Sequence, residues 1–286
     1  MAAGLLAGLL AAGLVAGCAS PAPPTGGEHR HPTIVSLNPC SDAILAEVAD
    51  PGQILAISAF SADPASSSLD PRDVARYRTV SGSAEEVLAL APDLVVGDAF
   101  VPPATRAAFA RLNLPMVQLP IATSVDESRA QVRQLALLAG HPGRGEALVA
   151  RIDAALAKAA PPPGSMPVAA VVWQGGGIVP GQRTLVADLL RRTGFANFSA
   201  ARGLGQADLL PLERMLADPP RVILAAGGRS GADADRLLSH PALAALAPGT
   251  VRVRLPPNLL WCGGPTIPRA IARLAQARRL AGRAPL

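Results

Sequence analysis

The feature of this sequence that most constrains its fold is an alternation between short apolar runs and longer amphipathic segments. In the first half of the chain, apolar runs at 33–37, 54–57, 94–97 and 116–119 alternate with segments of helical spacing. Short apolar strands that alternate with amphipathic helices are typical of βαβ units and of a parallel sheet. The first half is therefore predicted to form an α/β lobe.

A long helical segment interrupts this alternation, which then resumes. Leu148, Ile152 and Leu156 recur at helical spacing before a Pro-Pro-Pro-Gly sequence ends the helix, and strand-like runs follow at 168–173, 222–224 and 251–253. We therefore predict an α/β protein with two Rossmann-like lobes, at 33–140 and 163–286, joined by a single long rigid helix at 141–162. Open α/β sheets bind ligands beyond the carboxyl ends of their strands, so a ligand cleft is expected between the lobes.

The N-terminal residues are predicted to direct export. Residues 1–17 carry no charge and are too short to span a bilayer comfortably, as expected of a signal peptide. They end in Val15-Ala16-Gly17-Cys18, which resembles the lipobox of bacterial lipoproteins, so Cys18 is the expected lipidation site and the expected membrane anchor. The alternative is an ordinary cleaved signal with an incidental cysteine. Residues 18–32 are rich in Pro, Gly and Thr and are predicted to be a disordered tether, in which Glu28-His29-Arg30-His31 is a solvated stretch with at most weak metal affinity.

The composition argues against nucleic-acid binding. The net charge is only +5, aromatic residues make up 3% of the chain, and no arginine cluster is interleaved with aromatics. Hydrophobic residues make up 50% of the chain, which is enough for a sizeable, mainly aliphatic core.

The loops that follow the predicted strands hold the candidate ligand-binding residues. Glycine-rich stretches there let the backbone approach a ligand, and aromatic rings offer flat apolar faces. The alternative is that the aromatics cap the sheet edges as core. Ser41 and Asp42 are also candidate N-caps for the first helix. Three arginines are expected near these loops: Arg183, Arg202 and Arg229. The ligand-binding candidates are Asn38, Cys40, Asp42, Phe60, Asp98, Phe100, Trp173, Gln174, Trp261 and Cys262.

Cys40 and Cys262 leave three possibilities open. In an oxidising compartment they could form a disulfide, which would staple the cleft if they lie in opposite lobes. As two soft thiols they could instead ligate a metal centre in the ligand. The expectation that we favour is the simplest one, that both are buried small hydrophobic side chains.

Motifs of common enzymes are missing from the sequence. It has no HExxH, no complete phosphate loop and no Gly-x-Ser-x-Gly elbow. A cell-surface α/β enzyme remains the alternative function, and it would need a general base, for which Asp42, Asp63 and Asp98 are the plausible residues. A second alternative is a lipid-anchored interaction module without a small ligand, which predicts a filled cleft.

Two longer motifs carry a family resemblance. Residues 83–95 read SAEEVLALAPDLV, and residues 212–224 read LERMLADPPRVIL at the equivalent place in the second lobe. Together with Thr33-Ile34-Val35-Ser36-Leu37, they resemble the iron-siderophore and cobalamin periplasmic binding proteins of ABC importers. The resemblance covers about 33–279.

The resemblance implies a non-enzymatic solute-binding protein. It would act in the periplasm as a monomer, capture a metal-chelate nutrient without a cofactor or resident metal of its own, and deliver it to the membrane subunits of a transporter. The chelate would contain cobalt or iron. We favour a corrinoid such as cobalamin, because the aromatic candidates suit a flat ligand, and we place a ferric siderophore or haem next.

The resemblance also implies how the protein meets its transporter. Glu85 and Glu213 occupy equivalent places in the two motifs, where the family carries acidic residues that dock on arginines of the membrane subunits. Glu86 is instead predicted to form a capping box with Ser83. Without the resemblance, both docking candidates would be taken as solvated helix surface.

Overall fold

The computed structural model describes residues 31–64, 67–227, 240–246 and 249–283. The predicted signal peptide, its Cys18 and residues 18–30 of the predicted tether lie outside these ranges, as does Arg229. The last two residues of the predicted tether are instead packed on the lobe: His31 is partly buried, and the backbone oxygen of Pro32 accepts a hydrogen bond from Gln53. Among the described residues, no helix combines the length and the apolar character needed to cross a membrane.

The first lobe is built on a five-stranded parallel sheet with the strand order β3-β2-β1-β4-β5. Neighbouring residues of its central strand enter different hydrophobic clusters, Ile34 in one and Val35 in the other, so both faces of the sheet are covered. The strands are β1 (Ile34–Ser36), β2 (Ile54–Ser58), β3 (Thr79–Val80), β4 (Leu94–Asp98) and β5 (Met116–Leu119). The helices of this lobe are α1 (Pro39–Val48), α2 (Pro71–Val74), α3 (Ala84–Leu88), α4 (Pro103–Arg111) and α5 (Val125–Leu138).

The second lobe repeats this architecture with a four-stranded parallel sheet in the order β11-β10-β6-β8. A two-stranded antiparallel ribbon of β7 and β9 accompanies it. The strands are β6 (Val168–Gln174), β7 (Ile178–Val179), β8 (Phe195–Asn197), β9 (Asp208–Leu209), β10 (Val222–Ala226) and β11 (Val251–Arg254), and the helices are α7 (Leu185–Arg192), α8 (Leu212–Ala217) and α10 (Thr266–Arg283).

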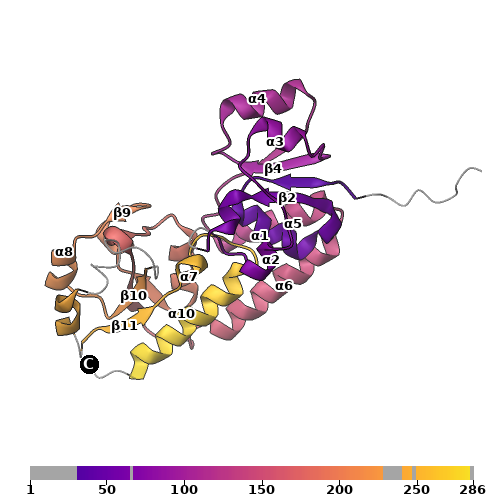
Figure 1. Ribbon diagram of the computed structural model, residues 1–286. Coiled ribbons are helices and arrows are strands. Elements are labelled where there is room, and N and C mark those ends of the chain that lie inside the picture. The colour runs from indigo at the N-terminus through magenta and orange to yellow at the C-terminus, as the bar shows by residue number, and fades with distance from the viewer. Residues whose placement is uncertain (1–30, 65–66, 228–239, 247–248, 284–286) are drawn as a thin grey trace, which may run out of the picture. The chain divides into compact units, whose positions relative to one another are not determined.

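Helix α6 (Pro142–Ala159) connects the two lobes. With 18 residues it is about 27 Å long at 1.5 Å per residue. It packs against α1 and α5 of the first lobe and against α10 of the second, and Figure 1 shows α6 and α10 lying side by side. One hydrophobic cluster therefore runs through both lobes, from Ile34 in β1 to Leu274 in α10.

The predicted α/β class and the two-lobed alternation are confirmed, but local details differ. Helix α5 is absent from the elements predicted from the sequence, although Val125, Ser128, Val132 and Leu135 are buried at helical spacing. The N-cap of α1 is Asn38 rather than Ser41 or Asp42, because its side chain accepts hydrogen bonds from the backbone N–H groups of the first helical turn.

The predicted capping box at α3 is only half formed. The hydroxyl of Ser83 accepts a hydrogen bond from the backbone N–H of Glu86, as expected. The carboxylate of Glu86 does not return to Ser83 but accepts from the backbone N–H and the hydroxyl of Ser81, at 2.7 and 2.6 Å. These hydrogen bonds stabilise the charged form and hold the pKa of Glu86 below its usual value.

Candidate functional site

Most of the residues predicted to bind the ligand line one of two cavities. The first cavity, with a volume of about 520 Å³, lies at the carboxyl ends of β1 and β4 and is lined by Asn38, Phe60, Asp98 and Phe100 among others. The strand order reverses between β1 and β4, because β2 and β3 lie on one side and β5 on the other. Open α/β sheets bind their ligands at such a switch point, so the topology explains why the first cavity lies there.

A polar link between Asn38 and Asp98 fixes the floor of the first cavity. The amide of Asn38 donates a hydrogen bond to one carboxylate oxygen of Asp98. The other oxygen accepts from the backbone N–H of Phe100 at 2.8 Å. The link ties the end of β4 to the N-cap of α1 and holds the loop that carries Phe100, whose side chain is 75% exposed.

Asp42 does not line a cavity, and its predicted contact with the ligand is wrong. It is fully buried, and its carboxylate accepts hydrogen bonds from the backbone N–H of Ser58 at 3.0 Å and from the hydroxyl of Ser61 at 2.6 Å. Burial raises the pKa of Asp42 to about 7, against the lowering effect of these hydrogen bonds. Asp42 therefore anchors the turn after β2, which presents the exposed ring of Phe60 to the first cavity.

The second cavity, with a volume of about 290 Å³, is formed by both lobes. Ile121 and Thr123, which precede α5, line it from the first lobe. The second lobe contributes Gln174 at the end of β6, Ile178 of β7 and Trp261, which is 50% exposed. Most of its lining residues are apolar, and its polar groups are mostly neutral amides and hydroxyls.

Arg183 is the charged side chain of the second cavity. It is exposed, and among the described residues it has no hydrogen-bond or ion-pair partner. Arg202, the other arginine that was expected near these loops and that the structure describes, pairs instead with Asp218. Arg183 is thus placed to meet an anionic group of a ligand.

Sequence reasoning missed most of the apolar residues of the second cavity, among them Ile121 and Ile178. Both are exposed although they are large and apolar, with exposed fractions of 55% and 37%. Ile178 follows the glycine stretch after β6 and pairs with Leu209 of β9. The sequence contained a signal for Ile178, because it directly follows glycines already placed in a ligand loop.

Trp173 belongs to the core, so the expectation that it binds ligand is corrected. It is fully buried in a cluster with Val171 and Met215, and its indole N–H donates to the backbone oxygen of Leu210 at 3.3 Å. The predicted strand ends at Trp173, whereas β6 continues to Gln174, which pairs with Ala226. Trp173 therefore lies inside the sheet rather than at the strand end beside the ligand loop.

Cys40 and Cys262 form a disulfide, so the expectation of two unbonded buried thiols is wrong, and neither thiol is available to ligate a metal. Their Cα atoms are 5.0 Å apart. The bridge joins the first turn of α1 to the loop before α10, and hence one lobe to the other. The residue before each cysteine lines a cavity, Pro39 the first and Trp261 the second.

Hydrogen bonds reinforce the disulfide across the same junction. The hydroxyl of Ser68 donates to the backbone oxygen of Asn258, and the backbone N–H of Gly264 donates to the hydroxyl of Ser128, both at 2.7 Å. Gly264 has a φ of +56°, and a Cβ there would meet a side-chain carbon of Ile44 at 2.6 Å. The approach of the loop to α1 thus requires glycine at this position.

Glu85 and Glu213 occupy equivalent positions in the two lobes. Each is the second residue of its helix, α3 or α8, and is exposed. Helix α3 precedes β4, the neighbour of β1, and α8 precedes β10, the neighbour of β6. Within the described parts of the chain, neither carboxylate has a hydrogen-bond or ion-pair partner.

Solved structures of several periplasmic binding proteins share this architecture. The apo form of the periplasmic heme-binding protein RhuT from Roseiflexus sp. RS-1 matches with a TM-score of 0.71 and 25% identity, over 89% of this chain and all of that one. The periplasmic vitamin B12 binding protein BtuF of Vibrio cholerae matches with a TM-score of 0.67 and 18% identity, over 88% and 98% of the two chains. A periplasmic heme-binding protein from Pseudomonas aeruginosa matches with a TM-score of 0.66 and 22% identity, over 89% and 94%.

Sequence comparison identifies the family more directly than these structures do. No curated protein sequence matches the chain. The profile of a family described as periplasmic binding protein matches residues 34–252, which span both sheets. Because this match covers most of the chain and agrees with its two-lobed α/β fold, the chain belongs to the periplasmic binding protein family.

Proposed function

We propose that this protein is the substrate-binding component of an ABC importer, and that its ligand is a metal chelate, with a corrinoid favoured over haem or a ferric siderophore. The observation that carries the proposal is the composition of the two cavities. Exposed apolar side chains, Phe60, Phe100 and Trp261, stand beside neutral hydrogen-bonding groups at the carboxyl ends of the strands. Most small-molecule sites combine mainly apolar walls with a few placed polar groups in this way.

The neutral polar groups favour a corrinoid over the other two chelates. A corrin ring carries many neutral side-chain amides, which Gln174, Thr123 and Asn38 can meet with hydrogen bonds. Haem carries two carboxylates and a ferric catecholate three negative charges, whereas Arg183 is the cation that lines the second cavity. The similarity to RhuT, a heme-binding protein, supports a flat metal macrocycle as the ligand without distinguishing a corrinoid from haem.

The two alternative functions fit the structure less well. An enzyme needs an accessible general base in its cleft. Asp42 is sealed in the core, both carboxylate oxygens of Asp98 hold a loop, and Asp63 is exposed but lines neither cavity. An interaction module predicts a filled cleft, whereas two cavities lie at the strand ends. We therefore propose binding and delivery, without catalysis, by a periplasmic monomer.

Delivery would use the two lobes together. The exposed carboxylates of Glu85 and Glu213, which have no partner within the described ranges, could form charge-assisted pairs with arginines of the membrane subunits. One such group in each lobe would fix the orientation of the protein on a transporter with two similar subunits. We propose in addition that Cys18, once lipidated, anchors the exported protein to the membrane.

Calorimetry with cyanocobalamin, dicyanocobinamide, hemin and ferric desferrioxamine tests the ligand. We expect both corrinoids to bind, and Trp261→Ala to weaken binding by about 2 kcal/mol, or roughly 30-fold, as the loss of an aromatic anchor does. Met166→Ala is the matched control, because Met166 is 81% exposed and lines neither cavity. Arg183→Gln should weaken the binding of cyanocobalamin, which carries a phosphate, more than that of cobinamide, which has none.

If hemin is the only one of the four compounds that binds, the ligand is haem rather than a corrinoid. If none of the four compounds binds, the proposal of a metal-chelate ligand is wrong.

A further inference from the structure

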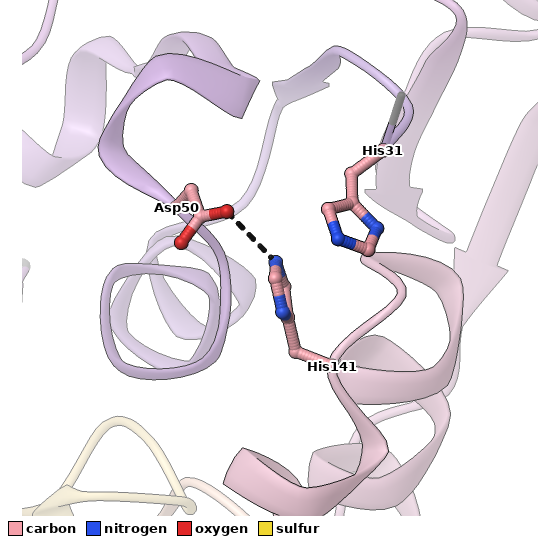
Figure 2. Close-up of side chains that lie close together, drawn as sticks. All are labelled: His31, Asp50 and His141. Carbon is pink, nitrogen blue, oxygen red and sulfur yellow. Dashed lines mark ion pairs between the residues drawn. The ribbon is translucent and has the colours of Figure 1, made fainter. Parts of the chain in front are cut away.

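Three side chains that are far apart in the sequence meet at the amino ends of the strands of the first sheet, on the side opposite the first cavity. Figure 2 shows the imidazoles of His31 and His141 facing the carboxylate of Asp50. One possible ligand atom from each residue lies within 4.8 Å of the other two. Nε2 of His141 is 3.2 Å from a carboxylate oxygen of Asp50, and the two imidazole centroids are 4.2 Å apart. All three residues are partly buried, so the cluster is ordered by packing but open to ions.

The neighbouring backbone holds this cluster in place through Gln53. The buried amide of Gln53 donates to the backbone oxygen of Pro32, next to His31, and to that of Ala139, both at 3.0 Å. Its oxygen accepts from the backbone N–H of Asp50 and lies 2.8 Å from Nε2 of His141. One side chain thus fixes the positions of the three segments that carry the cluster.

Gly140 and Arg144 complete the surroundings of the cluster. Gly140 has a φ of +80°, and a Cβ there would lie 2.1 Å from Nδ1 of His31, so only glycine lets this imidazole pack on the chain before α6. Arg144 binds the second carboxylate oxygen of Asp50 at 2.7 Å. That pair orients the carboxylate and leaves its first oxygen directed at His141, as an outer-shell partner of a metal ligand does.

We propose that His31, Asp50 and His141 form a binding site for a divalent transition-metal ion, with Zn²⁺ as the first choice. Two imidazoles and one carboxylate are a common ligand set for such ions. Ligand atoms about 2.0–2.2 Å from a tetrahedral ion lie about 3.3–3.6 Å from each other, and Nε2 of His141 and a carboxylate oxygen of Asp50 are already 3.2 Å apart. A fourth position would remain for water.

The site is separate from the proposed ligand cavities. His31 precedes β1 and Asp50 precedes β2, whereas the first cavity lies at the carboxyl ends of β1 and β4. A bound ion would fasten the chain just before β1 to the turn after α1 and to the junction of α5 and α6. It would stabilise the fold of this lobe and would not contact the transported chelate.

The test is a Zn²⁺ titration of the full chain, produced without a polyhistidine tag and stripped with EDTA. We expect one ion per chain, a rise in melting temperature on adding Zn²⁺, and a Co²⁺ derivative with the intense visible bands of a tetrahedral site. His31→Ala and His141→Ala should each weaken binding by roughly 100-fold or more, since even outer-shell changes cost about 10- to 100-fold.

His240→Ala is the matched control, because His240 lies in the second lobe and its ring accepts a hydrogen bond from the backbone of Ala242. Its Zn²⁺ affinity should equal that of the wild type. If His141→Ala does not fold, His31→Ala carries the test, because His31 precedes β1 and lies outside every helix and strand. Failure of the wild type to bind Zn²⁺ or Co²⁺, or equal affinity in the wild type and His31→Ala, would overturn the proposal.

Discussion

The Cys40→Ser/Cys262→Ser double variant should be substantially less stable than the oxidised wild type. The bridge joins residues separated by 222 positions. In the chain-entropy model, a cross-link over that length lowers the entropy of the unfolded chain enough to stabilise the fold by about 5 kcal/mol at 25 °C. Residual structure in unfolded chains reduces such values, and native disulfides typically contribute about 2–5 kcal/mol. We therefore expect a loss of about 2–5 kcal/mol in the free energy of unfolding.

The same variant should exchange ligand faster. The hydrogen bonds from Ser68 to Asn258 and from Gly264 to Ser128 remain after the bridge is lost, so the lobes should stay docked. Without the covalent tie, however, the junction between the two cavities can open more readily. We expect the association and dissociation rates of the ligand to rise together in stopped-flow measurements.

Urea unfolding followed by circular dichroism measures the stability difference. Both proteins should carry Cys18→Ser, which removes the third cysteine and prevents disulfide exchange. The wild-type pair treated with a phosphine reductant should match the double variant, and the reductant should not change the double variant itself. Oxidised wild type and double variant with equal unfolding free energies, within about 0.5 kcal/mol, would refute the argument that the bridge constrains the unfolded chain.

Three further predictions concern the buried acid, the docking carboxylates and the anchor. The folded protein keeps the proton of Asp42 up to a pH of about 7, whereas the unfolded chain loses it near 3.8. The wild-type free energy of unfolding should therefore fall as pH rises from about 4 to 7, by about 4 kcal/mol in total and by about 2–3 kcal/mol between pH 5 and pH 8. Asp42→Asn should lack this decline in urea unfolding, and parallel pH curves for the two proteins would contradict the reasoning. The double variant Glu85→Ala/Glu213→Ala should keep its melting temperature and ligand affinity yet lose transport in a cellular uptake assay; undiminished uptake would leave both residues as ordinary solvated surface. Cys18→Ser should move the protein from the membrane fraction to the soluble fraction, whereas a wild-type protein that is already soluble, with an unmodified N-terminus by mass spectrometry, would contradict lipidation.

Much of the candidate site could be predicted because it depends on local sequence. Ligand loops follow strands in open α/β sheets, so the apolar runs before Asn38, Asp98 and Gln174 were enough to place these residues at the cavities. Phe60 and Phe100 could be placed in the same way. These positions depend on where a strand ends, which composition and spacing indicate to within a residue or two.

An error of one or two residues in the predicted end of a strand or helix was enough to misplace Trp173 and Asp42. Because β6 runs one residue further than predicted, Trp173 is an interior strand residue, and its indole packs in the core with Val171 and Met215. An N-cap at Asn38 places Asp42 in the first turn of α1, directed into the lobe, rather than before the helix. Strand and helix ends depend on pairing with neighbours such as Ala226, which a single sequence does not show.

The sequence alone thus determined the class of this protein, because alternating hydrophobic patterns and family motifs are properties of contiguous residues. Only the tertiary structure decided which distant residues meet. It paired Cys40 with Cys262 across the two lobes, and it gathered His31, Asp50 and His141 at one edge of the first sheet. Such contacts arise from the packing of α1, α5 and α6 and of the loop before α10, and spacing along the chain carries no information about them.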